Sequence, residues 1–354
     1  MTQAHSLIGL SKNAAAHTAV LIMGLIAAFS TSARAEWHGG ERPIMGTEIR
    51  VWFWHEDTAT GNALVEDVFA EAERINQMMS TYIETSLISD VNNRAHEGPV
   101  HAGDELYYVV ERAVDISVLT LGAFDITYES VGQHYDFREG IRPDASTLSR
   151  EVAKIDYRFL ALDEDNKTIE FAEQGVRINL GGIAKGYFVD RGANILRAAG
   201  VRHGIVTAGG DSRLIGDRRG RPWMVGIRDP REDGQVAISV PLEGEAISTS
   251  GDYERYFEED GVRYHHIISP SSGEPVAGVH SATVFGPDAV MTDALSTSVF
   301  VMGVEKGLNM LGCLPDYEGI VIDSEGQIWY SIGLQTPSAP LQDVPATDPE
   351  PGKC

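Results

Sequence analysis

The chain has 354 residues, 43% of them apolar, and a formal net charge of −24 from 28 basic and 52 acidic side chains. This length and apolar content are enough for one large domain or for two. Such an acidic chain repels nucleic acid and anionic lipid as a bulk property, so we exclude both as general partners. The same charge is also typical of a protein that is simply soluble.

The N-terminal segment 1–35 is typical of a secretory signal peptide. Lys12 supplies a positive charge, and the apolar run 19–29 is far shorter than the roughly 20 residues that a membrane span needs. Ala33 and Ala35 then form a small-x-small cleavage pattern. No cysteine lies at the cleavage point, so we predict export to the periplasm without a lipid anchor. An uncleaved N-terminal anchor is the alternative.

Hydrophobic periodicity predicts the elements that follow. Alternating apolar residues predict a strand over 47–54, and apolar residues at helical spacing predict a helix around 64–79. In chain order we further expect a helix over 103–118, two strands around an Asp-Asn turn over 162–171, a strand over 176–180, a helix over 183–199, mostly strands over 202–285, helices near 288–302 and 305–312, and a closing hairpin over 317–331.

The order of these elements indicates the fold class. Strands and helices are mixed without a regular strand–helix–strand rhythm, which favours an α+β fold of mostly antiparallel strands with flanking helices. No linker interrupts 36–334, so we predict a single large domain there, followed by a disordered tail over 335–354 that is rich in proline and acid. The two cysteines, Cys313 and Cys354, form neither a disulfide framework nor a metal-binding spacing, although the two could pair with each other.

A glycine-rich turn, GGIAKG (181–186), joins the strand predicted over 176–180 to the next helix. Glycines let a ligand approach the backbone, and the helix that follows points free N–H groups at the same place. Lys185 adds a full positive charge. The spacing matches neither of the well-known nucleotide-binding glycine loops. The turn therefore indicates an anion site, or else a tight corner that carries an exposed lysine.

Five further blocks accompany this turn: MGT (45–47), TLGAFDIT (120–127), TAGGDSRLIG (207–216), the Ser/Thr-rich and histidine-containing stretch 248–276, and TDALSTSVFVMG (292–303). In this order the six blocks resemble the ApbE family of FAD:protein FMN transferases, from about Pro43 to Gly333. The resemblance implies an α+β fold, export and a Mg²⁺ requirement. It implies an enzyme that splits FAD, releases AMP and attaches FMN to a Thr or Ser of an exported target, such as a subunit of a respiratory complex.

The resemblance suggests a metal site. Asp293 and Thr297 are four residues apart, so on a helix they share one face, where a carboxylate and a hydroxyl can hold one ion. The family implies that both bind Mg²⁺ together with the backbone carbonyl of Gly182, and that Asp293 is catalytically essential. Alternatively, Asp293 only caps its helix. Asp211 either belongs to the metal neighbourhood or only braces its turn. Lys185 is expected to face the diphosphate.

His266 is the expected general base. It lies in HHIISP (265–270), where the family has a histidine before an Ile-rich strand, and a histidine can accept the proton of an attacking hydroxyl near neutral pH. On a strand, His265 would point to the opposite face. Either histidine could instead be a structural one.

The flavin is expected to occupy an apolar slot with a few polar anchors. We assign Met45 and Tyr82 to its walls, although Met45 and Phe124 could equally be plain core residues. Asp125 could also assist proton transfer or accept a hydrogen bond from the adenosine part. The full set of expected cofactor contacts is Met45, Tyr82, Ala123, Phe124, Asp125, Asn179, Lys185, Thr249, Ser250, His266 and Ile267.

Two positions depart from the family pattern, and two other functions stay open. Asn179 and Ser269 stand where the family usually has aspartate, and the loss of charge at Asn179 could weaken FAD binding. A FAD pyrophosphatase that releases FMN and AMP would need the same metal and donor site. An exported, non-catalytic flavin-binding protein could dispense with the metal pair.

Overall fold

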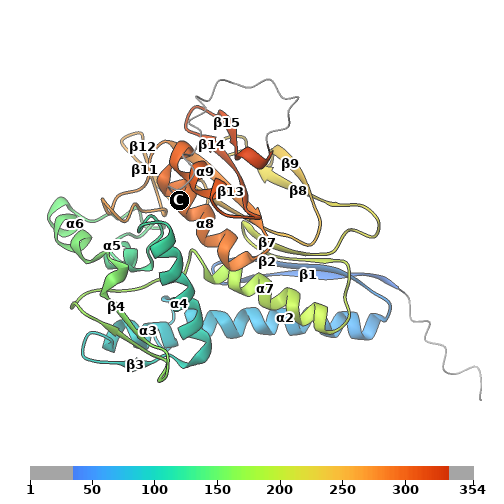
Figure 1. Ribbon diagram of the computed structural model, residues 1–354, viewed down its shortest axis with the longest axis horizontal. Helices are drawn as coiled ribbons and strands as arrows, with labels where there is room; N and C mark the ends of the chain where they lie inside the picture. The colour runs from blue at the N-terminus through green and yellow to red at the C-terminus, as the bar shows by residue number, and fades with distance from the viewer. Residues whose placement is uncertain (1–34, 335–354) are drawn as a thin grey trace, which may run out of the picture.

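A computed structural model describes residues 35–334 (Figure 1). The predicted signal peptide, the predicted tail and the proposed pairing with Cys354 lie outside the described residues. Within 35–334, no helix combines the length and the apolar character that crossing a bilayer requires.

The centre of the fold is an eight-stranded sheet in which every neighbouring pair is antiparallel, in the order β1-β2-β6-β7-β10-β13-β14-β15. This arrangement confirms the predicted fold class. Its strands are β1 (Glu36–Ile44), β2 (Thr47–His55), β6 (Gly204–Ala208), β7 (Asp211–Ile215), β10 (Ala246–Gly251), β13 (Val279–Gly286), β14 (Glu318–Asp323) and β15 (Ile328–Tyr330).

Three smaller sheets accompany the large one. A three-stranded sheet has the order β3-β5-β4, and two hairpins pair β8 with β9 and β11 with β12. Their bounds are β3 (Val100–His101), β4 (Leu160–Asp163), β5 (Thr168–Phe171), β8 (Trp223–Arg228), β9 (Val236–Leu242), β11 (Tyr256–Glu259) and β12 (Val262–His265).

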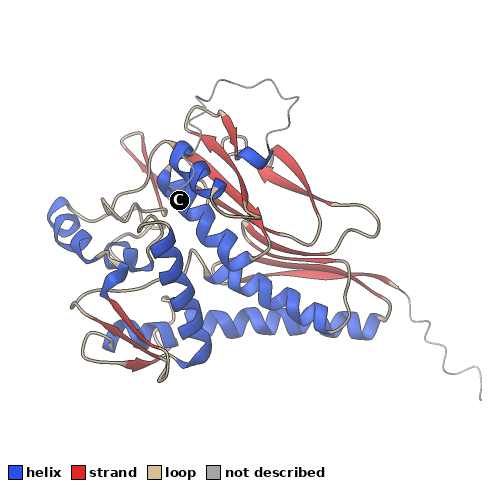
Figure 2. Cartoon of the chain, in the orientation of Figure 1, coloured by secondary structure: helices blue, strands red, loops and turns tan. Residues whose placement is uncertain are grey.

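The helices fall into two groups (Figure 2). The first group lies along the large sheet and consists of α2 (Thr58–Met79), α7 (Ala184–Ala198), α8 (Ala289–Met302) and α9 (Val304–Gly312). The second lies toward the three-stranded sheet, where α3 contacts β3 and α4 contacts β5, and consists of α3 (Leu87–Arg94), α4 (Gly103–Leu119), α5 (Glu129–Gly132) and α6 (Ala145–Glu151). Figure 1 shows α2 and α7 running beside each other below the large sheet.

One hydrophobic core joins the two groups. Strand β2 turns Ile49, Val51 and Phe53 inward, each at most 1% exposed, and the helical repeat predicted for α2 is buried against them. The same cluster includes residues of α4, β5, α7 and α8. Burial of each large apolar side chain stabilises the fold by about 1.5–3 kcal/mol, so this shared core holds both groups of helices in one unit.

The predicted strand over 176–180 is wrong. The segment pairs with no strand: the N–H and C=O of Ile178 both bond to the side chain of Asn92, at 2.7 and 2.9 Å. The N–H of Asn179 donates to the carbonyl of Ile126 at 2.9 Å. A carboxamide on α3 therefore supplies the hydrogen bonds that a neighbouring strand would supply.

The elements β1, α3, β3, α5 and α6 were not predicted from the sequence. The sequence of β1, EWHGGERPI, has no clear apolar alternation, and β1 is recognisable only through its full register with β2. The predicted strand around His266 is shorter than expected, since β12 ends at His265 and His266 lies in the bend that follows.

The crossing of α7 over α8 depends on a glycine. A Cβ added to Gly186 would lie 2.1 Å from the backbone oxygen of Ala289 and 2.8 Å from the Cβ of Asp293. The Ala289 oxygen belongs to the backbone and cannot rotate away as a side chain can. Any side chain at position 186 would therefore push α7 and α8 apart.

We expect Gly186→Ala to lower the free energy of unfolding by about 3 kcal/mol, the upper range for overpacking in a core, as measured by urea denaturation. Gly312→Ala is the matched control, because an added Cβ there meets nothing within 4 Å. The control should change stability by less than about 1 kcal/mol. Equal midpoints for the two variants would contradict this account of the helix crossing.

Candidate active site

Three charged side chains meet where α7 and α8 cross. The Lys185 Nζ lies 2.6 Å from Asp211 Oδ2 and 3.0 Å from Asp293 Oδ1. The other oxygen of Asp293 accepts the N–H of Gly186 at 2.9 Å. Asp211 and Asp293 are only 1% and 2% exposed. The structure therefore brings Lys185 and Asp293 together, as the site prediction requires, but it pairs the lysine with carboxylates.

Burial and mutual charge shift the pKa values of this cluster. Burial raises the pKa of Asp211, and the neighbouring charge of Asp293 raises it further, against the opposing effect of Lys185. Burial alone would lower the pKa of Lys185, but the two carboxylates outweigh it and the pKa is raised. Both oxygens of Asp211 are buried without a well-aligned hydrogen bond from any described residue, despite the short contact with Lys185. The cluster thus has unused capacity to bind a cation.

Hydroxyl groups line the next turn of α8. The Ser250 Oγ lies 3.1 Å from Thr297 Oγ1 and 2.9 Å from Ser296 Oγ. Gly182 faces the same place, because a Cβ built on it would lie 3.5 Å from Thr297 Oγ1 and 3.1 Å from the ring of Phe124. The absence of a side chain at Gly182 therefore leaves room beside the threonine.

The residues fit a magnesium ion by their chemistry. Mg²⁺ prefers oxygen ligands and usually keeps several waters, so a carboxylate, a hydroxyl and a backbone carbonyl suffice when a substrate phosphate completes the shell. Asp293, Thr297 and Gly182 offer these three donor types around one corner. Among the described residues, no cluster of three or more His, Cys, Asp or Glu forms a metal site made of side chains alone. The site thus suits an ion shared with a substrate.

A second polar group supports the glycine corner. The Asn179 Oδ1 accepts the N–H of Gly181 at 2.8 Å, and its Nδ2 donates to Glu129 Oε2 at 3.0 Å. The same Nδ2 lies 3.4 Å from Thr81 Oγ1, next to Tyr82 in the chain. Asn179 therefore holds the corner through its amide. An aspartate could not donate to Glu129 in this way unless one of the two carboxyl groups carried a proton.

Glu129 makes part of the stability pH-dependent. Burial raises its pKa from 4.5 to about 7, although the hydrogen bond from Asn179 and the charge of Arg177 act in the opposite direction. Because the pKa of Glu129 is raised in the folded state, the contribution of this residue to the free energy of unfolding is fully present below pH 4.5. It is lost as the pH rises through about 7.

We therefore expect Glu129→Gln to be more stable than the wild type at pH 8, by up to about 3 kcal/mol, and to lose this advantage at pH 4.5. Glutamine can still accept from Asn179 but cannot ionise. Urea denaturation across pH 4.5–8.5 measures the difference. A constant difference between the two proteins over this range would contradict the shifted pKa.

His266 lies beside the charged cluster. The backbone N–H of His266 donates to the carbonyl of Arg255 at 3.0 Å. The side chain of Arg255 in turn donates from Nη2 to the carbonyl of Gly46 at 3.1 Å. The ring nitrogen Nδ1 of His266 is buried with no hydrogen-bond partner among residues 35–334. Burial, together with the positive charges of Arg255, His265 and Lys185, lowers the pKa of His266 to about 3. The imidazole is therefore neutral near pH 7 and free to accept a proton.

The two neighbours of His266 have structural roles. His265 is 4% exposed, bonds the carbonyl of Val276 through Nε2 at 2.8 Å, and meets the ring of Phe300 edge-on. The N–H of Ile267 lies 3.3 Å from His265 Nδ1, and its side chain is buried in the core cluster that contains Phe300. Contact of Ile267 with a cofactor stays a prediction, and the contacts seen here are those of a core residue.

The proposed walls of the flavin slot differ in exposure. Met45 and Gly46 form a two-residue turn between β1 and β2, with φ values of 57° and 69°. That geometry favours glycine but here admits a methionine. Tyr82 is 84% exposed, whereas Phe124 is 4% exposed and contacts the core. Ala123 is half-buried next to Phe124. Tyr82 is therefore the freely accessible ring of this set.

Asp125 and Thr249 are already engaged with the protein. Asp125 accepts from the N–H and hydroxyl of Thr127 at 2.8 and 2.6 Å and from the N–H of Tyr157 at 2.8 Å. Burial raises its pKa despite these bonds. Thr249 bonds the hydroxyl of Thr283 at 2.9 Å. The observed bonds are those of residues that shape the loop and sheet around the site.

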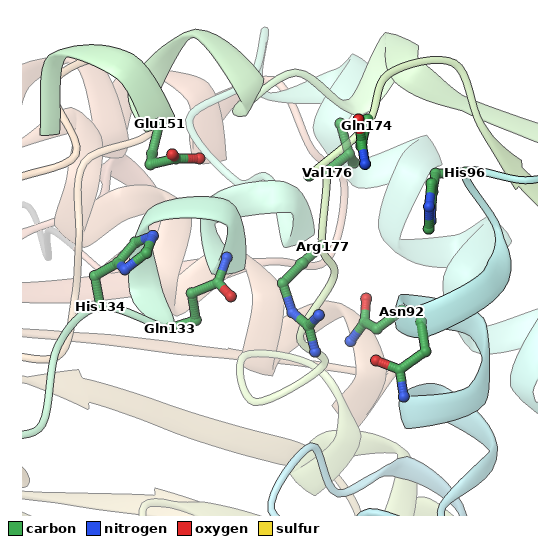
Figure 3. Close-up of a pocket in the computed structure, with 10 residues that line it drawn as sticks. Asn92, His96, Gln133, His134, Glu151, Gln174, Val176 and Arg177 are labelled. Atoms are coloured by element: carbon green, nitrogen blue, oxygen red, sulfur yellow. The ribbon is translucent and has the colours of Figure 1, made fainter. Parts of the chain in front are cut away.

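The cavities of about 340 and 410 Å³ lie elsewhere. The smaller one lies between α3, α5 and α6, and Figure 3 shows Arg177 between Gln133 and Asn92 at its wall. The larger one lies along α7. Neither is lined by a predicted site residue. We place the active site by its buried, mutually paired charges rather than by cavity size, because perturbed ionisable groups mark functional sites more directly.

Sequence reasoning missed Glu129 and Arg255. No motif marks either residue, because each acts through a partner far away in the sequence: Asn179 for the first and Gly46 for the second. The only local signal was their position within or next to blocks that the family resemblance had already selected.

Comparison with known proteins agrees with this geometry. The ApbE family model matches residues 45–321. The chain is 30% identical to the FAD:protein FMN transferase of Treponema pallidum over 85% of this chain and 89% of that protein, and 33% identical to the Vibrio cholerae one over 75% and 81%. The crystal structure of the ApbE protein of Thermotoga maritima aligns with a TM-score of 0.78 at 32% identity, covering 84% of this chain and 98% of that one. The flavin transferase ApbE of Vibrio cholerae aligns with a TM-score of 0.73 at 29% identity, with the same coverage. The chain therefore belongs to the ApbE family.

Proposed function

We propose that this protein transfers the FMN part of FAD to a Thr or Ser hydroxyl of an exported protein, with Mg²⁺ as cofactor and AMP as the second product. As a family member the chain is a flavin transferase, with FAD as its substrate and a protein as its acceptor. The metal, the hydroxyl acceptor and the released AMP are the parts that we propose.

The observation that carries the proposal is the pair of buried carboxylates at the crossing of α7 and α8, next to a corner that offers backbone N–H and hydroxyl groups. Buried acids with a single lysine between them suit a polyanionic substrate that arrives with a divalent cation. Asp293, Thr297 and the carbonyl of Gly182 would hold that cation. When bound, Mg²⁺ neutralises charge on the diphosphate and on the departing phosphate.

The protein residues perform the remaining steps. The acceptor hydroxyl forms a new O–P bond to the FMN phosphate, the diphosphate P–O bond breaks, and AMP leaves with the bonding electrons. His266 takes the hydroxyl proton, since it is neutral and its Nδ1 has no other partner. An anionic phosphate beside the imidazole would raise its basicity relative to the free protein. Asn179 keeps the glycine corner in place through the N–H of Gly181.

The test is incubation of the purified protein with FAD, Mg²⁺ and a candidate acceptor, followed by denaturing electrophoresis. We expect flavin fluorescence that stays with the acceptor band, appears only with Mg²⁺, and accompanies stoichiometric AMP. Equal FAD turnover with and without acceptor would instead identify a FAD pyrophosphatase. A protein that binds FAD but never turns it over would be a flavin-binding protein.

We also propose export to the periplasm, on the basis of the signal-peptide pattern in 1–35. Intact mass measurement of the protein from a bacterial periplasmic fraction should give a chain that begins at Glu36. A full-length chain retained in the cytoplasm would contradict the proposal.

A further inference from the structure

A second polar cavity, of about 410 Å³, lies along α7 on the side of β7 and the start of α8. Helix α7 contributes one face to it, with Tyr187, Asp190, Arg191, Asn194 and Arg197 at helical spacing. Arg213 of β7, Tyr108 of α4 and the segment 287–290 complete the lining. None of these residues takes part in the proposed flavin transfer.

The charge of this cavity is opposite to that of the protein. Three arginines line it against two aspartates, while the whole chain carries 28 basic and 52 acidic residues. Arginine is the residue best suited to recognise carboxylate and phosphate, because its planar guanidinium donates two parallel hydrogen bonds. A concentration of arginine in an acidic protein therefore points to an anionic ligand.

Arg213 supplies the donors. Its side chain is 12% exposed, and its Nε and Nη1 are buried without a hydrogen bond from any described residue. The Nε lies 3.1 Å from Asp190 Oδ1, but this ion pair does not align as a hydrogen bond and leaves Nη1 unused. Asp190 is itself held by the N–H of Ala289, at 2.8 Å from its other oxygen. Buried guanidinium donors without acceptors cost free energy that a bound anion would recover.

Arg197 strengthens the argument. It donates to the carbonyl of Leu214 and to the side chain of Asn194, each at 3.1 Å, so it is fixed in place and keeps further N–H groups. Burial and the neighbouring charge of Arg213 both lower its pKa. Two guanidinium groups that repel each other across a cavity are stabilised by an anion between them. The rings of Tyr108 and Tyr187, 6.2 Å apart, form an aromatic wall beside these charges.

We propose that this cavity is a second ligand site that binds a small molecule through a phosphate or carboxylate group held by Arg213 and Arg197, with an attached ring or apolar group against Tyr108 and Tyr187. The site is independent of the proposed flavin transfer. It lies on the same two helices that carry Lys185 and Asp293.

The test is calorimetric titration of the full-length protein with inorganic phosphate, succinate and phenyl phosphate. We expect saturable binding of phosphate, of succinate or of both, which tells the two ligand classes apart, and tighter binding of phenyl phosphate than of inorganic phosphate. Arg213→Gln should weaken binding by at least about tenfold, since it removes a hydrogen bond to a charged group. Arg158→Gln is the control, because it removes the same charge from a side chain that is 75% exposed, and it should bind like the wild type.

A second variant keeps the test decisive if Arg213→Gln fails to fold. Asp190→Asn removes the competing carboxylate but can still accept the N–H of Ala289, so it should bind the anion more tightly. Affinities that are the same in the wild type and in Asp190→Asn, or in the wild type and a folded Arg213→Gln, would overturn the proposal. Absence of saturable binding by all three probes would overturn it as well.

Discussion

Asp293→Ala should abolish flavin transfer, with a fall in kcat of at least about 10³-fold, comparable to the loss of a main electrostatic contact in a phosphoryl-transfer site. The carboxylate receives Lys185 on one oxygen and the N–H of Gly186 on the other, and it is the one charged member of the proposed metal ligands. Its removal takes the charge from the cation site and releases the first turn of α7. The rate is measured as the appearance of flavin fluorescence on an acceptor. The affinity for Mg²⁺ in the presence of FAD is measured by calorimetry.

Two companion variants separate chemistry from folding. Asp293→Asn keeps the shape and can still accept the N–H of Gly186, so it should fold like the wild type and yet lose Mg²⁺-dependent transfer. Ser298→Ala on the same helix is the control, because within 35–334 its hydroxyl bonds the carbonyl of Ala294 alone, at 2.7 Å, and turnover should persist. Full activity in Asp293→Ala would refute the metal assignment.

His266→Gln should lower kcat by about 10²–10⁴-fold, the usual contribution of a general base, with little change in FAD affinity. Glutamine preserves the polar volume but cannot take up a proton. His101→Gln is a suitable control, because that histidine is on the exposed side of β3 and bonds a loop carbonyl at 3.0 Å. Wild-type rates in His266→Gln would exclude the residue as the base.

The pH profile gives a second reading of His266. Because burial and nearby positive charges lower its pKa to about 3, the free protein keeps the imidazole neutral throughout pH 5–8. The value of kcat/KM, which reports the free enzyme, should therefore show no acidic limb near pH 6.5 that depends on this residue. A limb at that pH that disappears in His266→Gln would mean that the ring titrates normally and is better solvated than the structure indicates.

The parts of the fold that the sequence predicts are those with a local apolar period. Strand β2 and helix α2 follow directly from inward-facing residues at spacings of two and of three to four. The segment 176–180 shows the limit of this reasoning. Its apolar run resembles a strand, yet its hydrogen bonds come from Asn92, 86 residues away, and no local pattern reveals such a partner.

The candidate site is also only partly predictable from the sequence. The helical spacing of Asp293 and Thr297 predicts their shared face, and the glycine pattern predicts a corner that backbone and ligand can approach. The contact of Lys185 with Asp293 spans 108 residues and depends on how α7 crosses α8. The expectation that Lys185 faces a diphosphate considered only an external anion, whereas the fold supplies two internal ones.

The lysine between two buried acids has a consequence for how the protein is assembled. The Lys185 ammonium group already serves as counter-ion to Asp211 and Asp293, so we expect the protein to fold without a divalent ion, unlike small metallodomains that unfold under chelation. If the proposed function holds, a divalent cation that enters with the nucleotide would take the place of Lys185 beside Asp293, and the ammonium group would be available to the phosphates. The melting temperature should accordingly change little in EDTA, and a collapse of the fold there would show that the lysine cannot fill this role.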